Sequence, residues 1–127
     1  MIRYLSVEQV VSLHQQVIGH LTDAGVQDFR ALERAVGRPA TTFETEDLHA
    51  TLDAKAAALL HGLATAKPFA AGGRETALLA AECFLIANGA TLHATDRDLE
   101  RVADAIAAGE MSVEALAIWI RQRTGMR

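Results

Sequence analysis

Apolar residues recur at helical intervals along most of the chain, and capping or breaking residues separate the periodic segments. Ser6 and Gln9 have the spacing of a capping box, and the apolar positions after them predict a helix over residues 7–20. The segment TDAGVQD, residues 22–28, carries turn residues. A second, shorter helix is predicted over residues 29–36, because its apolar period is closed by a glycine and a proline.

Four further helices are predicted in the rest of the chain. They cover residues 52–65, residues 73–88, residues 95–108 and a segment that Ser112 caps. The first of them ends before a Lys-Pro bond, because the residue ahead of a proline is pushed out of helical geometry. The helix over residues 73–88 is apolar almost all round and is expected to be central and buried. The expected fold is all-α, one domain over residues 1–127, with about six helices around this helix.

Composition and charge narrow the classes of function. The chain has 12 basic and 16 acidic residues and a net charge of −4, which argues against an extended grip on nucleic acid or on an anionic membrane. No charge-free run is long enough to span a bilayer, and residues 1–13 lack the continuous apolar stretch of a signal peptide. The single cysteine, Cys83, is expected to be a small, inert core residue in a reducing compartment. The expected location is therefore the cytoplasm.

The stretch KPFAAGGRET, residues 67–76, places a glycine loop directly before the apolar helix. Such a loop can hold a phosphate, because unpaired backbone N–H groups and the helix dipole point at the same place. An alternative interpretation is that Arg74 and Glu75 are only solvated residues in the first turn of a helix, where Glu75 favours the dipole. Both interpretations remain open from the sequence.

The surrounding residues resemble a known family. LLHGLATAKPFAAGGRETALLAAECFLIANG, residues 59–89, is similar to the motif region of Fic/Doc proteins, whose loop follows the pattern His-Pro-Phe-x-Asp-Gly-Asn-Lys-Arg-Thr. DFRALERAVGRPATTF and AIAAGEMSVEALAIWIR are similar to segments of the death-on-curing (Doc) branch. The resemblance implies transfer of an AMP or phosphoryl group from a nucleotide to a target-protein hydroxyl, with Mg²⁺ bound by the motif acid. It also implies toxins that are paired with an antitoxin.

The loop departs from this pattern at its reactive positions. Lys67 stands at the position of the catalytic histidine, Ala71 at that of the metal-binding acid and Gly73 at that of the asparagine. Arg74 replaces a lysine, and Glu75 replaces an arginine with the opposite charge. Pro68, Phe69, Gly72 and Thr76 match the pattern. The positions carried over as an anion or nucleotide site are Lys67, Phe69, Gly72, Gly73, Arg74 and Thr76.

Each departure has a chemical consequence. A lysine with an ordinary pKa is protonated at neutral pH, so Lys67 is suited to bind a phosphate and not to accept a proton. Ala71 removes the oxygen ligand that the motif would offer to Mg²⁺, which argues against this ion. Five histidines lack metal-site spacing, and His61 is more typical of a half-buried helix residue than of a substitute base. No metal site is expected, and ATP or another nucleotide is the candidate ligand.

Two hypotheses for the function follow. The favoured one is a pseudo-enzyme related to toxin–antitoxin toxins, without the transfer activity, which binds a nucleotide, another anion or a protein. The alternative is an enzyme with altered chemistry, a transferase acting on a phosphate-containing substrate, in which Lys67 and Glu75 form a catalytic cation–carboxylate pair. Convergence of these two side chains in a closed pocket would favour the alternative, and exposure of both to solvent would weaken it.

The segment TTFETEDLH, residues 41–49, is polar and aperiodic and is expected to be a loop or a short extended flap. The resemblance places this segment over the motif, where it receives the backbone of the target. Thr42, Phe43 and Thr45 are therefore candidate docking residues for an antitoxin or a target protein, with Phe43 as the anchor. The alternative is that Phe43 folds back onto the core. No oligomeric state is predicted.

Overall fold

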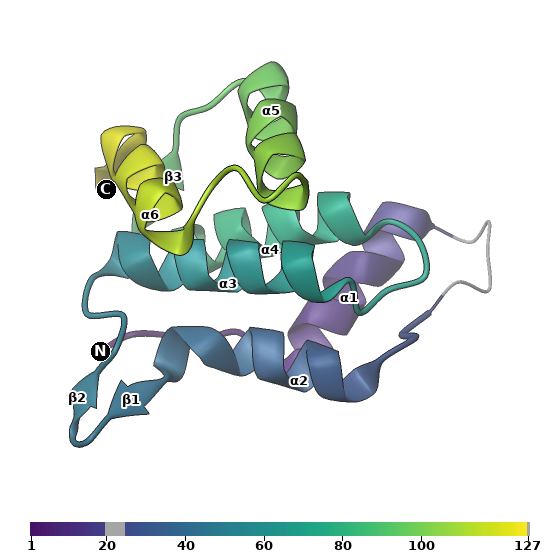
Figure 1. Ribbon diagram of the computed structural model, residues 1–127, viewed down its shortest axis with the longest axis horizontal. Helices are drawn as coiled ribbons and strands as arrows, with labels where there is room; N and C mark the ends of the chain where they lie inside the picture. Colours follow the sequence, from purple (N-terminus) through teal and green to yellow (C-terminus); the bar gives the residue numbers. More distant parts are fainter. Residues whose placement is uncertain (20–24, 127) are drawn as a thin grey trace.

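Two antiparallel helices run through the middle of the molecule (Figure 1), and they supply about half of its buried hydrophobic residues. The computed structural model describes residues 1–19 and 25–126. The central helices are α3 (Leu52–Ala66) and α4 (Gly73–Ala87). Alanines at positions 56–58, 80 and 81 are buried, so the backbones approach closely, while Leu59, Leu63 and Phe84 fill the space between neighbouring helices. The expected all-α fold with a buried central helix is confirmed.

The other helices cover the central pair from two sides. On one side lie α1 (Val7–Ile18) and α2 (Phe29–Gly37), the second continued by the 3-10 turn η1 (Arg38–Ala40). On the other side lie α5 (Asp96–Ala107) and α6 (Val113–Gln122). Ser6 and Gln9 form the predicted capping box of α1, and Ser112 caps α6. The predicted ends of the helices are correct to within about two residues where the structure describes them. The turn predicted over residues 22–28 lies partly outside the described residues.

Two small antiparallel sheets complete the described structure. The strands β1 (Thr42–Phe43) and β2 (Glu46–Asp47) form a hairpin, which agrees with the expected short extended flap. The strands β3 (Ala90–Leu92) and β4 (Thr124–Met126) form the other sheet, although α5 and α6 lie between them in the sequence. This second sheet was not predicted, because strands of three residues are too short to show an alternating pattern.

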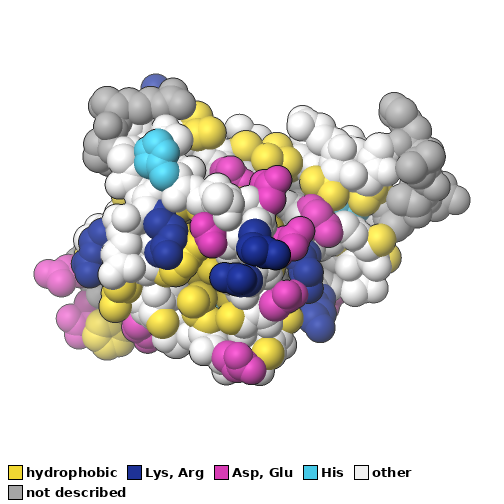
Figure 2. Space-filling view, turned by 90° about the horizontal axis from the view of Figure 1, so that it is seen from above, with side chains coloured by type: hydrophobic (Ala, Val, Ile, Leu, Met, Phe, Trp, Pro, Cys, Tyr) yellow, Lys and Arg dark blue, Asp and Glu magenta, His cyan; other side chains and the backbone are white. Residues whose placement is uncertain are grey.

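The surface has no single sign of charge on the side where α5 and α6 lie. Acidic side chains are interspersed there with those of lysine and arginine (Figure 2). A search of the described helices for one of sufficient length and apolarity to span a bilayer finds none.

Candidate functional site

The loop between α3 and α4 has a left-handed backbone conformation at both of its ends. Helix α3 ends at Lys67, whose φ of 49° lies in the left-handed region. Helix α4 begins after Gly72, whose φ of 71° also lies there. A Cβ atom added to Gly72 would stand 2.8 Å from Cγ2 of Ile18, so a larger residue would collide with α1. Gly72 is thus required both by conformation and by space.

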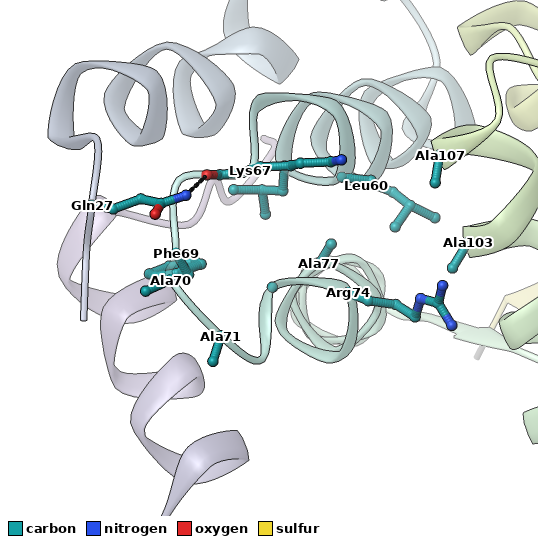
Figure 3. A pocket seen from close by; sticks show the side chains of 13 residues that line it. Gln27, Leu60, Lys67, Phe69, Ala70, Ala71, Arg74, Ala77, Ala103 and Ala107 are labelled. Atoms are coloured by element: carbon teal, nitrogen blue, oxygen red, sulfur yellow. Dashed lines mark hydrogen bonds between the residues drawn. The ribbon is translucent and has the colours of Figure 1, made fainter. Parts of the chain in front are cut away.

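A second segment of the chain holds this loop through backbone hydrogen bonds. The N–H groups of Gln27 and Asp28 donate to the carbonyl of Pro68 at 2.8 and 3.3 Å, and Ala70 donates to the carbonyl of Gly25 at 3.1 Å. The side chain of Gln27 donates from Nε2 to the carbonyl of Lys67 at 2.9 Å (Figure 3). The loop is therefore fixed by a short antiparallel bridge.

His14 of α1 fixes the other side of the loop. Its imidazole stacks on the buried ring of Phe69, with centroids 3.9 Å apart and planes within 8° of each other. Its Nε2 donates to the carbonyl of Ala71 at 2.7 Å. His14 is only 2% exposed, so it is an internal brace of the loop and not a group that meets a ligand. The histidine within the apolar period of residues 7–20 was the sequence signal for this contact.

A pocket of about 360 Å³ opens beside the loop, between α3, the start of α4 and α5. Its cationic lining residues are Lys67 and Arg74, which approach it from opposite sides, with Ala77 between them (Figure 3). Gly73, the first residue of α4, also lines it, and no side chain caps this helix. The first N–H groups of a helix without a cap have no intrahelical acceptor, so they are donors for an anion.

Arg74 is partly neutralised by a residue from another helix. Its guanidinium forms an ion pair with Asp104 of α5, and the two side chains are 47% and 62% exposed. An exposed pair of this kind contributes about 0.2–1 kcal/mol. Asp104 therefore competes modestly with an incoming anion, and no local sequence pattern links the two residues.

The residues of the predicted anion site separate into two groups. Lys67, Phe69, Gly73 and Arg74 line the pocket, although the ring of Phe69 is 5% exposed and packs mainly against His14. Gly72 and Thr76 do not line it. The Thr76 hydroxyl is fully buried and donates to the carbonyl of Gly72 at 2.7 Å. Gly72 and Thr76 therefore shape the start of α4, and the hydroxyl of Thr76 is already committed.

Lys67 and Glu75, the candidate catalytic pair, do not converge. Both side chains are exposed, and Glu75 lines a different groove, between α4 and α5, with Glu82 and Asp96. Burial, and secondarily the Asp96 carboxylate, raises the pKa of Glu82 in that groove. The ion pairs of the described residues are Lys55–Asp47 and Arg74–Asp104, neither of which joins Lys67 to Glu75. The geometry thus weakens the hypothesis of a new catalytic pair.

The pocket offers poor ligands for Mg²⁺. Its lining contains no carboxylate, the methyl group of Ala71 stands at the position of the motif acid, and the side-chain oxygen present is the amide of Gln27. Over residues 1–19 and 25–126, no cluster of three or more histidine, cysteine or acidic side chains could hold a metal ion. His61 does not line the pocket; burial, and then the charge of Arg38, lowers its pKa. His20 lies outside the described residues.

The hairpin is attached at the opposite end of α3 from the loop. Its Asp47 binds Lys55 in the first turn of α3, whereas the loop follows the last turn of that helix (Figure 1). Ala66 lies eleven positions after Lys55 in the helix, or about 16 Å at 1.5 Å per residue. The expectation from the resemblance that this segment lies over the motif is therefore wrong for this chain. Phe43 is 70% exposed, which excludes the alternative that it folds onto the core.

Comparison with known proteins finds matches that cover most of the chain. The profile of the Fic/DOC family matches residues 4–85, which include α1, the hairpin and the whole loop. The chain belongs to the Fic/DOC family. It is also 38% identical over 104 residues to a protein described as Toxin Doc from Mycolicibacterium smegmatis, a match that covers 82% of this chain and 78% of that protein. The resemblance of the chain to the Fic/Doc family and its Doc branch is confirmed.

Proposed function

We propose that this member of the Fic/DOC family is a pseudo-enzyme that binds the phosphate of a nucleotide beside the loop and does not transfer it. The observation that supports the proposal is the N-terminus of α4, which no side chain caps. There the N-terminal N–H groups meet a pocket that also receives the cationic side chains of Lys67 and Arg74. The charge and the backbone donors suit a phosphate group, and about 360 Å³ of space lies next to them.

The chemistry of the lining supports binding without transfer. Transfer to a hydroxyl needs a group that accepts the proton of that hydroxyl, and Lys67 is an exposed ammonium in the place of the family's histidine. Stabilisation of the transferred phosphoryl group by Mg²⁺ needs oxygen ligands, which this lining does not provide. Arg74, Lys67 and the helix N-terminus would hold the phosphate in its ground state.

The relation to a protein described as Toxin Doc supports a role connected with toxin–antitoxin systems. The partner in this role is an antitoxin or a former target protein, and the exposed Thr42, Phe43 and Thr45 of the hairpin remain the proposed docking residues. The hairpin is attached in the first turn of α3, whereas the pocket is lined by the second half of this helix and by the loop, so a partner on the hairpin would leave the pocket accessible.

Two measurements test the proposal. Incubation with labelled ATP, Mg²⁺ and a cell lysate should give no labelled protein above background, whereas titration calorimetry should detect binding of ATP. The variant Lys67→Ala/Arg74→Ala should bind ATP about tenfold more weakly, which corresponds to about 1.4 kcal/mol. The matched control Arg97→Ala/Arg101→Ala removes two arginines from α5 away from the pocket and should bind as the parent does.

A third variant sharpens the test. Asp104→Asn frees Arg74 from its ion pair and should strengthen ATP binding by about two- to fivefold, because an exposed pair contributes up to about 1 kcal/mol. A labelled band that disappears in Lys67→Ala would show that the protein is an enzyme. ATP binding that is insensitive to Lys67 and Arg74 would place the nucleotide elsewhere.

A further inference from the structure

A charged groove lies between α2 and α3 and shares no residue with the pocket beside the loop. It has a volume of about 310 Å³. Arg34 and Arg38, one helical turn apart, line it together with Ala35, Gly62 and Thr65. Side chains four residues apart on a helix lie about 5–6 Å from each other, so the two guanidinium groups face the same groove.

Small residues give this groove its depth. A Cβ atom added to Gly62 would stand 3.0 Å from Cδ of Arg38 and 3.5 Å from Cα of Ala35. The absence of a side chain at position 62 therefore lets the stem of Arg38 lie directly on α3. The guanidinium group at the end of that stem is left free to meet a ligand, because both Arg34 and Arg38 are exposed.

The two arginines have no acidic partner within the described chain. The ion pairs over residues 1–19 and 25–126 are Lys55–Asp47 and Arg74–Asp104. Asp28 lies at one end of the groove, but its carboxylate accepts a hydrogen bond from the N–H group of Ala31 as the cap of α2. Glu33, on the same helix, is exposed and makes no ion pair with either arginine.

The positive charge of the groove extends to neighbouring groups. Burial, and then the charge of Arg38, lowers the pKa of His61. Burial, then the charges of Lys55 and Arg38, lowers the pKa of His49. Glu114 opposes this effect on both histidines without reversing it. Arg30, one turn before Arg34, is exposed as well and lengthens the basic stripe along α2. Arg30, Arg34 and Arg38 thus form a basic stripe that makes no ion pair among the described residues, on a chain whose net charge is −4.

We propose that the groove between α2 and α3 binds a helix of a partner protein whose acidic side chains are spaced one turn apart. Carboxylates at that spacing match Arg34 and Arg38, and each can accept two parallel hydrogen bonds from a guanidinium group. The groove is large enough for the acidic side chains but not for a whole helix, which therefore lies across its rim.

A helical protein segment fits this surface better than a nucleic acid does. The basic stripe is one helix wide and carries three arginines on a chain with excess negative charge, so a phosphate backbone would meet repulsion outside the stripe. The inference is independent of nucleotide binding beside the loop, because the two sites share no residue.

The test uses the full chain and a fluorescent, alanine-based helical peptide with glutamate at every fourth position. Binding is measured by fluorescence anisotropy at low salt. The double variant Arg34→Gln/Arg38→Gln should bind about tenfold more weakly, since it loses two exposed charge pairs. Two control peptides are tested on the parent protein: one has glutamine at the same positions, and the other has its glutamates at consecutive positions. Each should bind about as weakly as the intact probe binds to the double variant.

Two further variants separate the groove from general charge. Arg97→Gln/Arg101→Gln removes two arginines with the same spacing from α5. Asp98 lies beside them, and its pKa is lowered chiefly by hydrogen bonds with Thr95 and also by the charges of Arg123 and Arg101. This variant should retain binding. Thr65→Phe fills the groove at an exposed position without changing the charge and should weaken binding.

Other results would overturn the inference. Equal losses in the α2 and α5 variants, or equal binding of the peptide with consecutive glutamates, would mean nonspecific attraction. A single-stranded oligonucleotide that binds more tightly than the peptide and is lost in the α2 variant would identify a nucleic acid as the occupant. If the double variant melts early, Arg34→Gln alone serves, with an expected loss of about threefold. ATP binding should be unchanged in all of these variants.

Discussion

Gly72 and Gly73 are neighbours in the loop, but the structure requires only the first to be glycine. Gly72 has a φ of 71° and would bring a Cβ atom within 2.8 Å of Ile18. Gly73 is the first residue of α4, and a Cβ atom there would meet nothing within 4 Å. The two positions thus allow the backbone requirement to be tested with a matched control.

Gly72→Ala should destabilise the protein by about 1–3 kcal/mol, because it combines an unfavourable backbone conformation with overpacking against α1. At this chain length that is a fall in Tm of roughly 4–12 °C. Gly73→Ala should leave Tm unchanged or raise it by a few degrees, since alanine favours the helix. Thermal unfolding followed by circular dichroism measures both, and equal Tm values would show that the loop has another conformation in solution.

Glu82 gives a prediction on pH. Burial, then the charge of Asp96, raises its pKa above the ordinary value of 4.5, so the ionised form is less favourable in the folded than in the unfolded protein. Ionisation therefore lowers stability as the pH rises through and above 4.5. Glu82→Gln should raise the urea midpoint at about pH 8 and should not raise it at about pH 4. A gain of equal size at both pH values would mean that packing, and not charge, is responsible.

At the scale of residues, the sequence predicts those features that depend on the identity of a single residue. The motif alone shows that Lys67 and Ala71 stand at the positions of the pattern's histidine and acid, and Lys67 and Arg74 do line one pocket. The contact between Arg74 and Asp104 depends on how α5 packs against α4, which no local pattern records. The brace formed by His14 could be suspected only from a polar residue within an apolar period.

Cys83 is half-buried, and its thiol pKa is raised first by burial and then by Glu82.

At the scale of elements, the hairpin is attached to the helical core by one buried lysine. The ammonium of Lys55 is 1% exposed and donates to the carbonyl of Pro39 at 3.2 Å and to Asp47 of β2 at 3.1 Å. It also lies 5.4 Å from the centre of the Tyr4 ring. Burial alone would lower the pKa of Lys55, but its interactions with Tyr4 and Asp47 outweigh this effect and raise it.

Removing the carboxylate of the Lys55–Asp47 pair should lower the free energy of unfolding more than removing the ammonium. Asp47→Asn leaves a buried ammonium without its carboxylate and should destabilise the protein by about 1–2 kcal/mol, less than for a fully buried pair because Asp47 is 49% exposed. Lys55→Met places an apolar chain of similar length in the core and should change stability by less than about 1 kcal/mol. Urea unfolding measures both free energies.

Hydrogen exchange locates the effect of this pair. In both variants the N–H group of Leu48, which donates to the carbonyl of Thr41 at 2.9 Å, should exchange faster because the hairpin has lost its attachment. The amides in the middle of α4 should exchange more slowly than that of Leu48. Uniformly faster exchange in Asp47→Asn would show that the pair stabilises the whole core and not the hairpin.

Helix boundaries were predictable because each is fixed by a few neighbouring residues, such as the caps Ser6 and Ser112. The pairing of β3 with β4 was not, since it joins segments that are distant in the chain. The position of the hairpin at the opposite end of α3 from the loop also depends on packing. Lys55, the residue that attaches the hairpin, lies on a helix whose sequence is almost wholly apolar.

At the scale of the whole molecule, four segments that are separate in sequence hold the loop in one shape. They are α1 through His14, the bridge at residues 25–28, and the ends of α3 and α4. Because this support does not involve the side chains that differ from the family pattern, the scaffold should accept the family's residues. The backbone permits each change: position 73 has free space, position 71 is exposed, and histidine tolerates the left-handed conformation at position 67 better than most residues do.

We therefore predict that Lys67→His, Ala71→Asp, Gly73→Asn and Glu75→Arg together will strengthen nucleotide binding, measured by calorimetry with ATP and Mg²⁺. Each change alone should have little effect, because residues that act as a unit contribute non-additively. An arginine at position 75 is opposed by the helix dipole at a cost of about 0.3–1 kcal/mol, so the fourfold variant should be slightly less stable than the parent. The threefold variant that retains Glu75 is the control, and it should bind ATP with Mg²⁺ more weakly because a carboxylate remains near the phosphates. A fourfold variant with unchanged circular dichroism and no gain in binding would show that the backbone of the loop, and not only its side chains, has diverged from the family.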